Sequence, residues 1–510
     1  MVQLHGWQTE CLNLWAQNGY MGIVNAVTGS GKTVLALAAI QHLRLFSNRE
    51  LRVKIVVPQT FLASQWKDEL KQHLGANTRE VGMYCGKRKD IGRKYMIYVI
   101  NSARYSLARH ILNDIYAGCS VLLIADECHH YGSAENNRIF DFYKALEKNA
   151  PYYALGLSAT PEIANFNVIS TPLGREIYCY DLERALTDRI ISRFVLFSIK
   201  IHFTPSERAE YEELSENLKR CLMTIKKAYP ELNGISSGLF FAQLQRLAAM
   251  DYDCSSIAKT ALILMYRRRT LCHMATERPL GAISIVKALP THSRIILFCE
   301  RIYAAEQLHR DLLEQYPGAA GLYHSKMADH TRRDILERYK HGSLRLLICC
   351  KALDEGLDIP STDAGIIVSS SMSARQRVQR LGRMLRHSKE IKRIYYLYIG
   401  ESSEDCELVN GLGTLDNCVP IVTLRYTSGA FIHSGYEKLR NKVLEYVSVR
   451  ALSTKLLEAM DRNIDRALMR GDFLLSESVC RENLLESKSV AQRNYWTSVL
   501  YVIHARMGKL

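Results

Sequence analysis

Short apolar runs alternate with longer helical stretches in two separate parts of this 510-residue chain, and this alternation constrains the fold most strongly. The first set of runs is IVNAV before a glycine loop, RVKIVVP at 52–58, YVIN at 98–101, VLLIADE at 121–127 and YALGLSAT at 153–160. The second set is RIILFCE at 294–300, LRLLICC at 344–350, AGIIVSS at 364–370 and RIYYLYIG at 393–400, with helical stretches at 303–315 and 329–340. Strands that alternate with helices predict a parallel sheet covered on both faces. We therefore predict an α/β fold with two parallel-sheet lobes.

Helical periodicity interrupts the second lobe and returns near the end of the chain. Residues from about 205 to 280 have the period of helices, which predicts a helical insertion. After residue 400 the strand pattern weakens, and LSTKLLEAMDRNIDRALM is the clearest amphipathic segment beyond it. The expected domains are a first lobe at 1–170, a second lobe at 171–400 that carries the insertion, and a mainly helical C-terminal region at 401–510.

Composition narrows the class of protein. The formal net charge of +15 favours a polyanionic partner such as nucleic acid. No apolar run reaches the roughly 18–20 residues of a membrane span, and the first residues lack a signal-peptide pattern, which favours a cytoplasmic protein without a membrane partner. The 14 cysteines include no C-x-x-C pair, so buried thiols are favoured over a zinc ribbon or disulfides.

A glycine loop, AVTGSGKT at 26–33, follows the first apolar run and opens a helix. Backbone N–H groups in such a loop point toward phosphate, and its two glycines allow close approach. The expected phosphate-binding residues are Thr28, Gly29, Ser30, Gly31 and Lys32. Lys32 is expected to contact the β and γ phosphates, and Thr33 to hold Mg²⁺. The motif departs from its strict form because Ala26 occupies the first glycine position.

Two carboxylates, Asp126 and Glu127, stand at the end of the apolar run VLLIA, where strand ends meet the crevice of an open α/β sheet. Asp126 can hold Mg²⁺, and Glu127 can orient or deprotonate an attacking water. An acidic helix start is the alternative explanation. The neighbouring Cys128, His129 and His130 suggest zinc, but no further Cys or His pair completes a tetrahedral set, so a zinc site is disfavoured.

A basic segment, QRLGRMLR at 379–386, places Gln379, Arg383 and Arg386 on one face of a helix. Guanidinium groups suit bidentate phosphate contacts. An arginine that neutralises charge on a γ-phosphoryl group contributes about 10³–10⁵ in rate. A solvated face, or one that binds nucleic-acid backbone, is the alternative, and the spacing around Gly382 favours the catalytic interpretation.

Together these motifs resemble those of superfamily 2 helicases and translocases over about residues 4–400. Their wording is most similar to the XPB-like branch, which is itself similar to phage recombination helicases and restriction-enzyme motor subunits. AVTGSGKT resembles motif I, VVPQTFLASQW at 56–66 motif Ia, DECH at 126–129 motif II, LSAT at 157–160 motif III, RIILFCE motif IV, ALDEGLDIP at 352–360 motif V and QRLGRMLR motif VI. The resemblance implies two RecA-like lobes that bind ATP and Mg²⁺ between them.

The resemblance also implies roles for single residues. Gly356 and Asp358 are expected to approach the nucleotide, and Gln8, in LHGWQ at 4–8, to contact the base. In that segment His5 replaces the family's usual arginine, and the aromatic residue is Trp7. The residues expected to couple hydrolysis to lobe movement are His129, Ser158, Thr160 and Gln379. The residues expected to contact nucleic-acid backbone are Pro58, Gln59, those at 101–104, His324, Ser325 and those of motif V.

The leading interpretation is an ATP-dependent DNA helicase or double-strand DNA translocase acting in repair, recombination or defence against foreign DNA, with DNA favoured over RNA. An RNA-dependent ATPase or remodeller is one alternative, because the same motor parts serve both polymers. An ATP-switched subunit of a multi-protein defence or restriction complex is another, because no nuclease motif is evident. That reading implies a protein partner such as a nuclease. The oligomeric state stays open.

Overall fold

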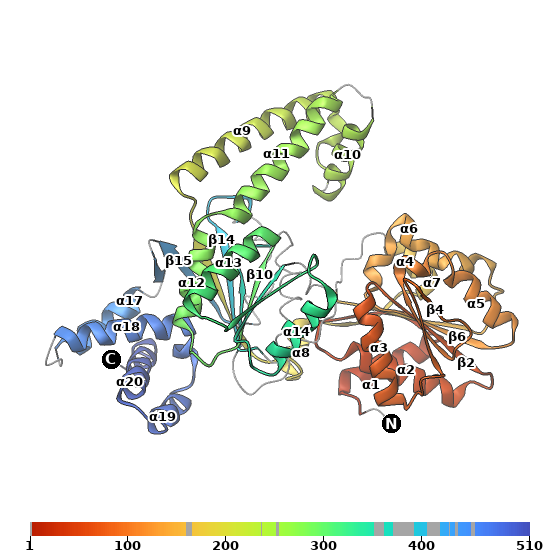
Figure 1. The fold of residues 1–510 in the computed structure, drawn as a ribbon, viewed down its shortest axis with the longest axis horizontal. Coiled ribbons are helices and arrows are strands. Elements are labelled where there is room, and N and C mark those ends of the chain that lie inside the picture. Colours follow the sequence, from red (N-terminus) through yellow and green to blue (C-terminus); the bar gives the residue numbers. More distant parts are fainter. Residues whose placement is uncertain are drawn as a thin grey trace. The chain divides into compact units, whose positions relative to one another are not determined.

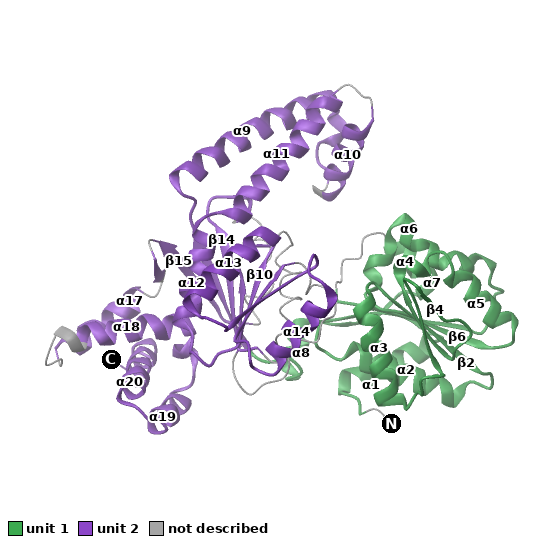
Figure 2. Cartoon of the chain, viewed as in Figure 1, with its two compact units in different colours: residues 1–193, 352–361, 375–391 green, residues 194–351, 362–374, 392–510 purple. Residues whose placement is uncertain are grey.

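The computed structural model describes residues 3–159, 166–235, 237–250, 254–350, 362–370, 392–404, 419–427, 429–433, 437–449 and 454–509. The described residues form two compact units, of which the first ends at Arg193 and the second begins at Phe194 (Figure 2). Each unit contains an eight-stranded sheet in which neighbouring strands are mostly parallel. The predicted α/β fold with two parallel-sheet lobes is thus confirmed.

The sheet of the first unit has the strand order β4-β3-β5-β2-β6-β7-β1-β8. Its strands are β1 (Met21–Ala26), β2 (Leu51–Val57), β3 (Val81–Cys85), β4 (Arg88–Lys89), β5 (Tyr95–Val99), β6 (Ser120–Ala125), β7 (Tyr152–Ser158) and β8 (Glu176–Tyr180). All neighbours are parallel except β3 and β4. Because β8 pairs with β1, the first sheet continues beyond residue 170, where the sequence pattern places the boundary of the lobe.

Helices cover both faces of this sheet. Its helices are α1 (Gly6–Gln17), α2 (Lys32–Phe46), α3 (Thr60–Leu74), α4 (Ile100–Ala103), α5 (Leu107–Tyr116), α6 (Ala134–Asn137), α7 (Phe166–Leu173) and α8 (Leu182–Thr187), with 3₁₀ helices at Cys128–Gly132 and Arg138–Ala145. Helices α1 to α3 lie on one face, and α5 and α7 on the other (Figure 1). Every residue of β6 is buried as a result, which explains why its sequence is a continuous apolar run.

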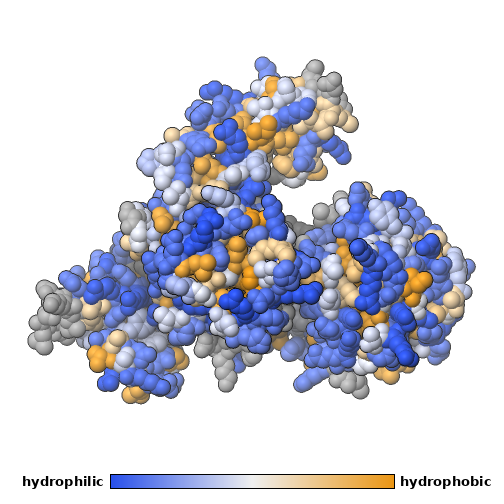
Figure 3. Space-filling model, in the orientation of Figure 1, coloured by the Kyte–Doolittle hydropathy of each residue, from blue (hydrophilic) through white to orange (hydrophobic). Residues whose placement is uncertain are grey.

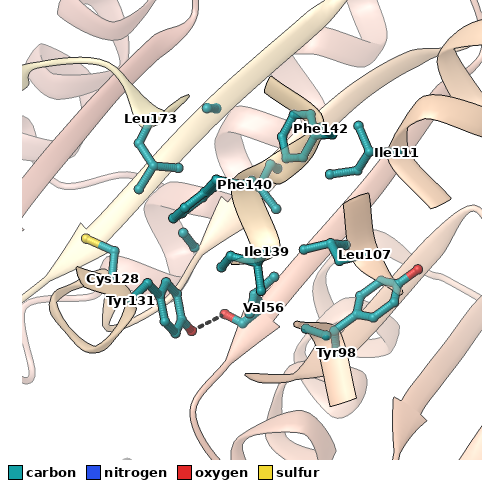
Figure 4. Packing of buried hydrophobic residues seen from close by; sticks show 14 of the residues in the cluster. Val56, Tyr98, Leu107, Ile111, Cys128, Tyr131, Ile139, Phe140, Phe142 and Leu173 are labelled. Atoms are coloured by element: carbon teal, nitrogen blue, oxygen red, sulfur yellow. Dashed lines mark hydrogen bonds between the residues drawn. The ribbon is translucent and has the colours of Figure 1, made fainter. Parts of the chain in front are cut away.

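A hydrophobic cluster anchors the helical layer to the strands that carry the site. Phe142 of the 3₁₀ helix packs near Ile111 of α5, and Leu107 lies beside Ile139 (Figure 4). Each fully buried side chain of this size contributes roughly 1.5–3 kcal/mol relative to an exposed one. In the same view the Tyr131 hydroxyl donates a hydrogen bond to the Val56 carbonyl oxygen at 3.0 Å. This packing fixes the carboxyl ends of β2 and β6 relative to one another.

The sheet of the second unit has the order β11-β12-β10-β13-β14-β9-β15-β16. Its strands are β9 (Phe194–Ile201), β10 (Ile295–Cys299), β11 (Ala320–His324), β12 (Leu346–Cys350), β13 (Ala364–Ile367), β14 (Lys392–Ile399), β15 (Ile421–Thr427) and β16 (Ala430–His433), and its helices include α12 (Glu277–Ala288), α13 (Ile302–Gln315) and α14 (Asp329–Lys340). The helical stretches predicted at 303–315 and 329–340 are confirmed by α13 and α14. The C-terminal region also adds β15 and β16 to the sheet, which the sequence pattern did not indicate.

The predicted helical insertion is confirmed as an arm of α9 (Pro205–Ala228), α10 (Ser237–Ala249) and α11 (Ser255–Met274) (Figure 1). Helix α9 begins with a capping box in which the side chains of Thr204 and Glu207 each accept a backbone N–H bond from the other residue. The three helices share their own apolar cluster. Apolar side chains also show on the visible face of the arm (Figure 3), and Met223 and Ile263 are exposed.

The C-terminal helices pack together and attach to the second sheet. They are α17 (Glu437–Ser448), α18 (Thr454–Arg470), α19 (Glu477–Leu485) and α20 (Val490–Arg506). Arg393 of β14 forms an ion pair with the buried Asp472 at 2.7 Å, and the Tyr495 hydroxyl donates to the same carboxylate. Across the described ranges, we find no helix with the combined length and apolar character that crossing a bilayer requires.

Candidate nucleotide site

The loop between β1 and α2 contains two glycines in a left-handed backbone conformation. Gly29 and Gly31 have φ values of 83° and 94°, in the left-handed region that side-chain-bearing residues rarely adopt. Lys32 is the first residue of α2, so the loop ends where the unpaired N–H groups of the helix begin. The Gln8 side-chain amide donates to the Gly31 carbonyl oxygen at 2.9 Å and accepts from the His5 N–H at 2.8 Å. Gln8 therefore links α1 to the phosphate loop.

Side chains within the loop hold its shape. The Lys32 Nζ donates to the Ala26 carbonyl oxygen at 2.9 Å, and the Ser30 hydroxyl donates to the Val27 carbonyl oxygen at 2.7 Å. Thr28 and Ser30 are buried, and Lys32 is 9% exposed. The ammonium group is thus kept at the loop and away from bulk solvent.

Asp126 lies at the carboxyl end of β6 and is bonded through several of its atoms. Its N–H donates to the Val56 carbonyl oxygen at 2.9 Å, and its own carbonyl oxygen accepts from the Tyr131 hydroxyl at 2.7 Å. Its Oδ1 accepts from the Glu127 N–H at 3.1 Å, and its Oδ2 accepts from Trp66 Nε1 at 2.8 Å. Burial, and then the neighbouring Glu127 charge, raise the pKa of the Asp126 carboxyl above its usual range. The site therefore favours a cation beside these two acids.

Glu127 follows in a strained backbone conformation. Its φ of 49° and ψ of 49° lie in the left-handed region, which costs a residue with a side chain on the order of 1–3 kcal/mol. Such strain is maintained only where the surrounding structure fixes it, and it is concentrated at functional sites. Here it turns the chain directly after Asp126, so that both acids line the same cavity.

A cavity of about 700 Å³ joins these elements within the first unit. It brings together eight predicted site residues, namely Thr28, Gly29, Ser30, Gly31, Lys32, Thr33, Asp126 and Glu127. Sequence reasoning missed three residues of α3 and three that follow α8, namely Leu62, Gln65, Glu69, Asp188, Arg189 and Ile190. The three α3 residues recur at helical spacing, and Leu62 and Gln65 lie inside motif Ia, which was a usable signal. The residues after α8 carry no motif.

Next to the cavity, His129 connects Glu127 to the end of β7. Its Nδ1 lies 3.2 Å from the Ser158 hydroxyl and 3.5 Å from the Glu127 carboxylate. Burial lowers the pKa of His129 to about 4, so the imidazole is neutral near pH 7. A neutral imidazole can transmit a movement of Glu127, which follows β6, to Ser158 at the end of β7 without a change of charge.

Other residues that the sequence analysis named lie outside the cavity or outside the described residues. Cys128 is buried in the hydrophobic cluster of the first unit, where its thiol packs rather than facing the cavity (Figure 4). Trp7 stacks on Tyr180 with ring centroids 4.6 Å apart and is 3% exposed, so its ring belongs to the core. The predicted residues Thr160, Gly356, Asp358, Gln379, Arg383 and Arg386 lie outside the described residues.

The side chains in the cavity fit a nucleotide with Mg²⁺. Thr33 and Asp126 supply the hydroxyl and carboxylate oxygens that Mg²⁺ prefers. Loop amides and Lys32 supply donors for phosphate oxygens. Within the described ranges, no three His, Cys, Asp or Glu side chains gather as a candidate metal cluster. The hydroxyl of Thr33 and the carboxylate of Asp126 therefore suit Mg²⁺ that is also bound by the phosphates of a nucleotide.

Comparison with known sequences assigns both units. A family model of the type III restriction enzyme res subunit matches residues 1–163, and a model of the helicase conserved C-terminal domain matches residues 282–388. The DNA 3'-5' translocase XPB2 of Sulfurisphaera tokodaii is 24% identical over 76% of this chain and 79% of that protein. A Haloarcula marismortui protein, named as a candidate DNA 3'-5' helicase Rad25, is 23% identical over 79% of this chain and 54% of its own length. The chain thus spans only about half of that second relative.

Solved structures agree on the fold. The helicase MrfA bound to DNA and AMPPNP superposes with a TM-score of 0.53 and 13% identity, over 83% of this chain and 52% of that chain. The Saccharomyces cerevisiae protein Dbp5 bound to RNA and ADP BeF3 gives 0.51 and 11%, over 82% of this chain and 89% of that chain. Both sheets are therefore RecA-like. The two matched domains and these relatives imply a nucleic-acid-dependent ATPase that is similar to helicases and translocases of the XPB-like kind.

Proposed function

We propose that this chain is an ATP-dependent DNA translocase or helicase that serves DNA repair, recombination or defence against foreign DNA. One observation carries the proposal: the phosphate loop, both carboxylates and the motif III serine are linked within the first unit. Lys32, Asp126 and Glu127 line one cavity, and His129 bridges Glu127 to Ser158. Hydrolysis and the end of β7 are thereby connected through two side-chain contacts.

Each residue of the cavity would have a separate task. Lys32 would bind the β and γ phosphates, while Thr33 and Asp126 would hold Mg²⁺. When bound there, Mg²⁺ would supply positive charge against the phosphate oxygens. Glu127 would orient the attacking water and take its proton. Arg383 and Arg386 of motif VI would add positive charge at the γ-phosphoryl group.

Backbone contacts with the polymer are proposed at strand ends. Pro58 and Gln59 follow β2, Asn101 is the second residue after β5, and His324 ends β11 of the second sheet. Parallel neighbours in a sheet present their carboxyl ends at the same edge, so Pro58, Gln59 and Asn101 lie at the edge of the first sheet that carries the site, and His324 lies at the carboxyl edge of the second sheet. A net charge of +15 suits phosphate binding that weakens as salt rises. Nucleotide-driven changes in lobe closure would then move the polymer stepwise.

DNA is proposed over RNA because of the sequence relatives. The two relatives described above carry names that specify DNA, and their similarity extends over more than three quarters of this chain. The two superposed structures hold DNA in one case and RNA in the other, so they support only the fold.

A triplex-displacement assay tests translocation directly. A labelled third strand is placed on duplex DNA, and its release is followed with ATP, without ATP, and with Lys32→Ala. ATP-dependent release by the parent protein that is lost in the variant supports a double-strand DNA translocase. A parent that hydrolyses ATP only with RNA would establish the RNA remodeller instead. Activity that needs a co-purifying subunit would establish the ATP-switched subunit.

A further inference from the structure

Trp66 joins motif Ia to the acid expected to hold Mg²⁺. It lies in the second turn of α3, is 2% exposed, and its Nε1 donates to Asp126 Oδ2 at 2.8 Å. The indole N–H is a donor only, so this bond has one possible direction. A hydrogen bond from a neutral donor to a buried carboxylate is stronger than one between neutral groups. Trp66 thus restrains one oxygen of this carboxylate.

The remaining bonds of Asp126 show why the restraint matters. The Glu127 N–H holds Oδ1 at 3.1 Å, and the main chain of Asp126 is fixed by Val56 and Tyr131. An ionised carboxylate has about four lone-pair positions, and these two donors occupy one on each oxygen. These two bonds, within the described residues, leave each oxygen able to accept a metal ion or its bound water as well. Trp66 is thus one of two donors that hold the carboxylate in the part of the chain that the structure describes, and its loss would leave the adjacent backbone N–H as the other.

Helix α3 also connects the proposed polymer contact to this carboxylate. It begins at Thr60, directly after Pro58 and Gln59, and Trp66 lies about 9 Å further along the helix axis at 1.5 Å per residue. Leu62, Gln65 and Glu69 of the same helix line the nucleotide cavity. A displacement at the start of α3 would therefore reach Asp126 through a rigid element.

We propose that Trp66 is a positioning residue that orients the Asp126 carboxylate for Mg²⁺ and links it to α3. This inference rests on the proposed nucleotide site. Its action is indirect, because the indole touches the carboxylate and not the substrate. It predicts that loss of the indole N–H weakens metal binding at the site more than it weakens the fold.

The test compares Trp66→Phe with Trp15→Phe. Trp15 is a matched control, because it is 1% exposed in the same unit and its Nε1 donates to the Ala154 carbonyl oxygen at 2.9 Å. Binding of Mn²⁺ to each purified full-length protein with saturating ADP is measured by electron paramagnetic resonance. We expect Trp66→Phe to raise the Mn²⁺ dissociation constant about tenfold, as the loss of a hydrogen bond to a charged group predicts. Trp15→Phe should leave it unchanged.

Equal Mn²⁺ affinity in the two variants would overturn the proposal. Trp66→Met is made alongside, because methionine adapts to irregular cavities. Of Trp66→Phe and Trp66→Met, the one whose melting temperature matches that of Trp15→Phe is used for the comparison of Mn²⁺ affinity. A parent that binds Mn²⁺ with ADP but responds to no polymer would refute the proposed function and leave the role of Trp66 testable by the same titration.

Discussion

Replacing Arg278 with methionine removes the central cation of a buried cluster in the second unit. Arg278 is 1% exposed and is the second residue of α12, at the root of the arm. Its Nε donates to the Cys272 carbonyl oxygen at 2.6 Å, and its Nη1 donates to the Leu397 carbonyl oxygen at 3.0 Å and to that of Val368. Its Nη2 forms an ion pair with the Glu404 carboxylate. One side chain therefore connects the arm to the ends of β13 and β14.

Arg278→Met is expected to lower the stability of the second unit, because it leaves the Glu404 carboxylate buried without its counter-ion. Glu404 is 6% exposed and, among the described residues, would keep a neutral donor in the Ile399 N–H at 3.0 Å. Removing one partner of a buried ion pair costs about 3–5 kcal/mol, because the other charge stays buried without its counter-ion. For a unit of this size, that loss lowers the melting temperature by roughly 5–15 °C.

Differential scanning calorimetry of the full chain measures this shift. Arg440→Met is the matched control, because Arg440 is 36% exposed and forms its ion pairs near the surface, with Asp461 at 2.7 Å and Asp465 at 3.3 Å. An exposed pair of this kind contributes only about 0–1 kcal/mol. Adding Glu404→Gln to Arg278→Met should recover part of the loss, since no charge then stays buried. A melting temperature for Arg278→Met within 2 °C of that for Arg440→Met would refute the reasoning. A difference of about 2 °C corresponds to less than 1 kcal/mol in the free energy of unfolding.

Three further predictions concern the site and the arm root. Gly31→Ala should abolish binding of a fluorescent ATP analogue. The φ of 94° at this position is strained for alanine, and the new Cβ would lie 2.7 Å from Gln8 Nε2. Near-parental affinity for the analogue would contradict this prediction. Ser158→Ala removes the hydroxyl 3.2 Å from His129 Nδ1, so polymer-stimulated kcat should fall while the nucleotide Kd stays the same; a weakened Kd with unchanged kcat would argue against coupling. Burial lowers the pKa of His273 to about 4, so the unfolded chain takes up a proton first as pH falls below about 6.5. Stability should drop by up to about 3 kcal/mol between pH 6.5 and 4, and His273→Gln should flatten that slope in urea titrations; an unchanged slope would exclude this histidine as the cause.

The buried strands and the phosphate loop were predictable because their signals are local. A parallel strand covered on both faces, such as β6, is a continuous apolar run, and the loop at 26–33 is a contiguous motif. Strand β15 was missed because it buries alternate residues only, so its apolar content is diluted. Strand β4 has two residues, too few for any pattern.

The missed parts of the site depend on tertiary contacts. The bond between Trp66 and Asp126 joins residues 60 positions apart, and no periodicity indicates which carboxylate an indole will meet. Arg189 reaches the cavity from beyond β8, more than 150 residues after the loop. Trp7 was named only as the aromatic residue of the segment at 4–8, and nothing in that segment indicates that its ring stacks on Tyr180. The motifs therefore identified the phosphate loop and the two acids, whereas the residues that contact them depend on tertiary packing.

Steady-state ATP hydrolysis at low salt tests the central claim most directly. The parent protein is assayed alone and with duplex DNA, single-stranded DNA or RNA, beside Lys32→Ala and Glu127→Gln. The account predicts hydrolysis that DNA stimulates, that added salt suppresses, and that both variants lose while they keep the parental circular dichroism spectrum. Hydrolysis at the parental rate in either variant, or a parent that no nucleic acid stimulates, would contradict it.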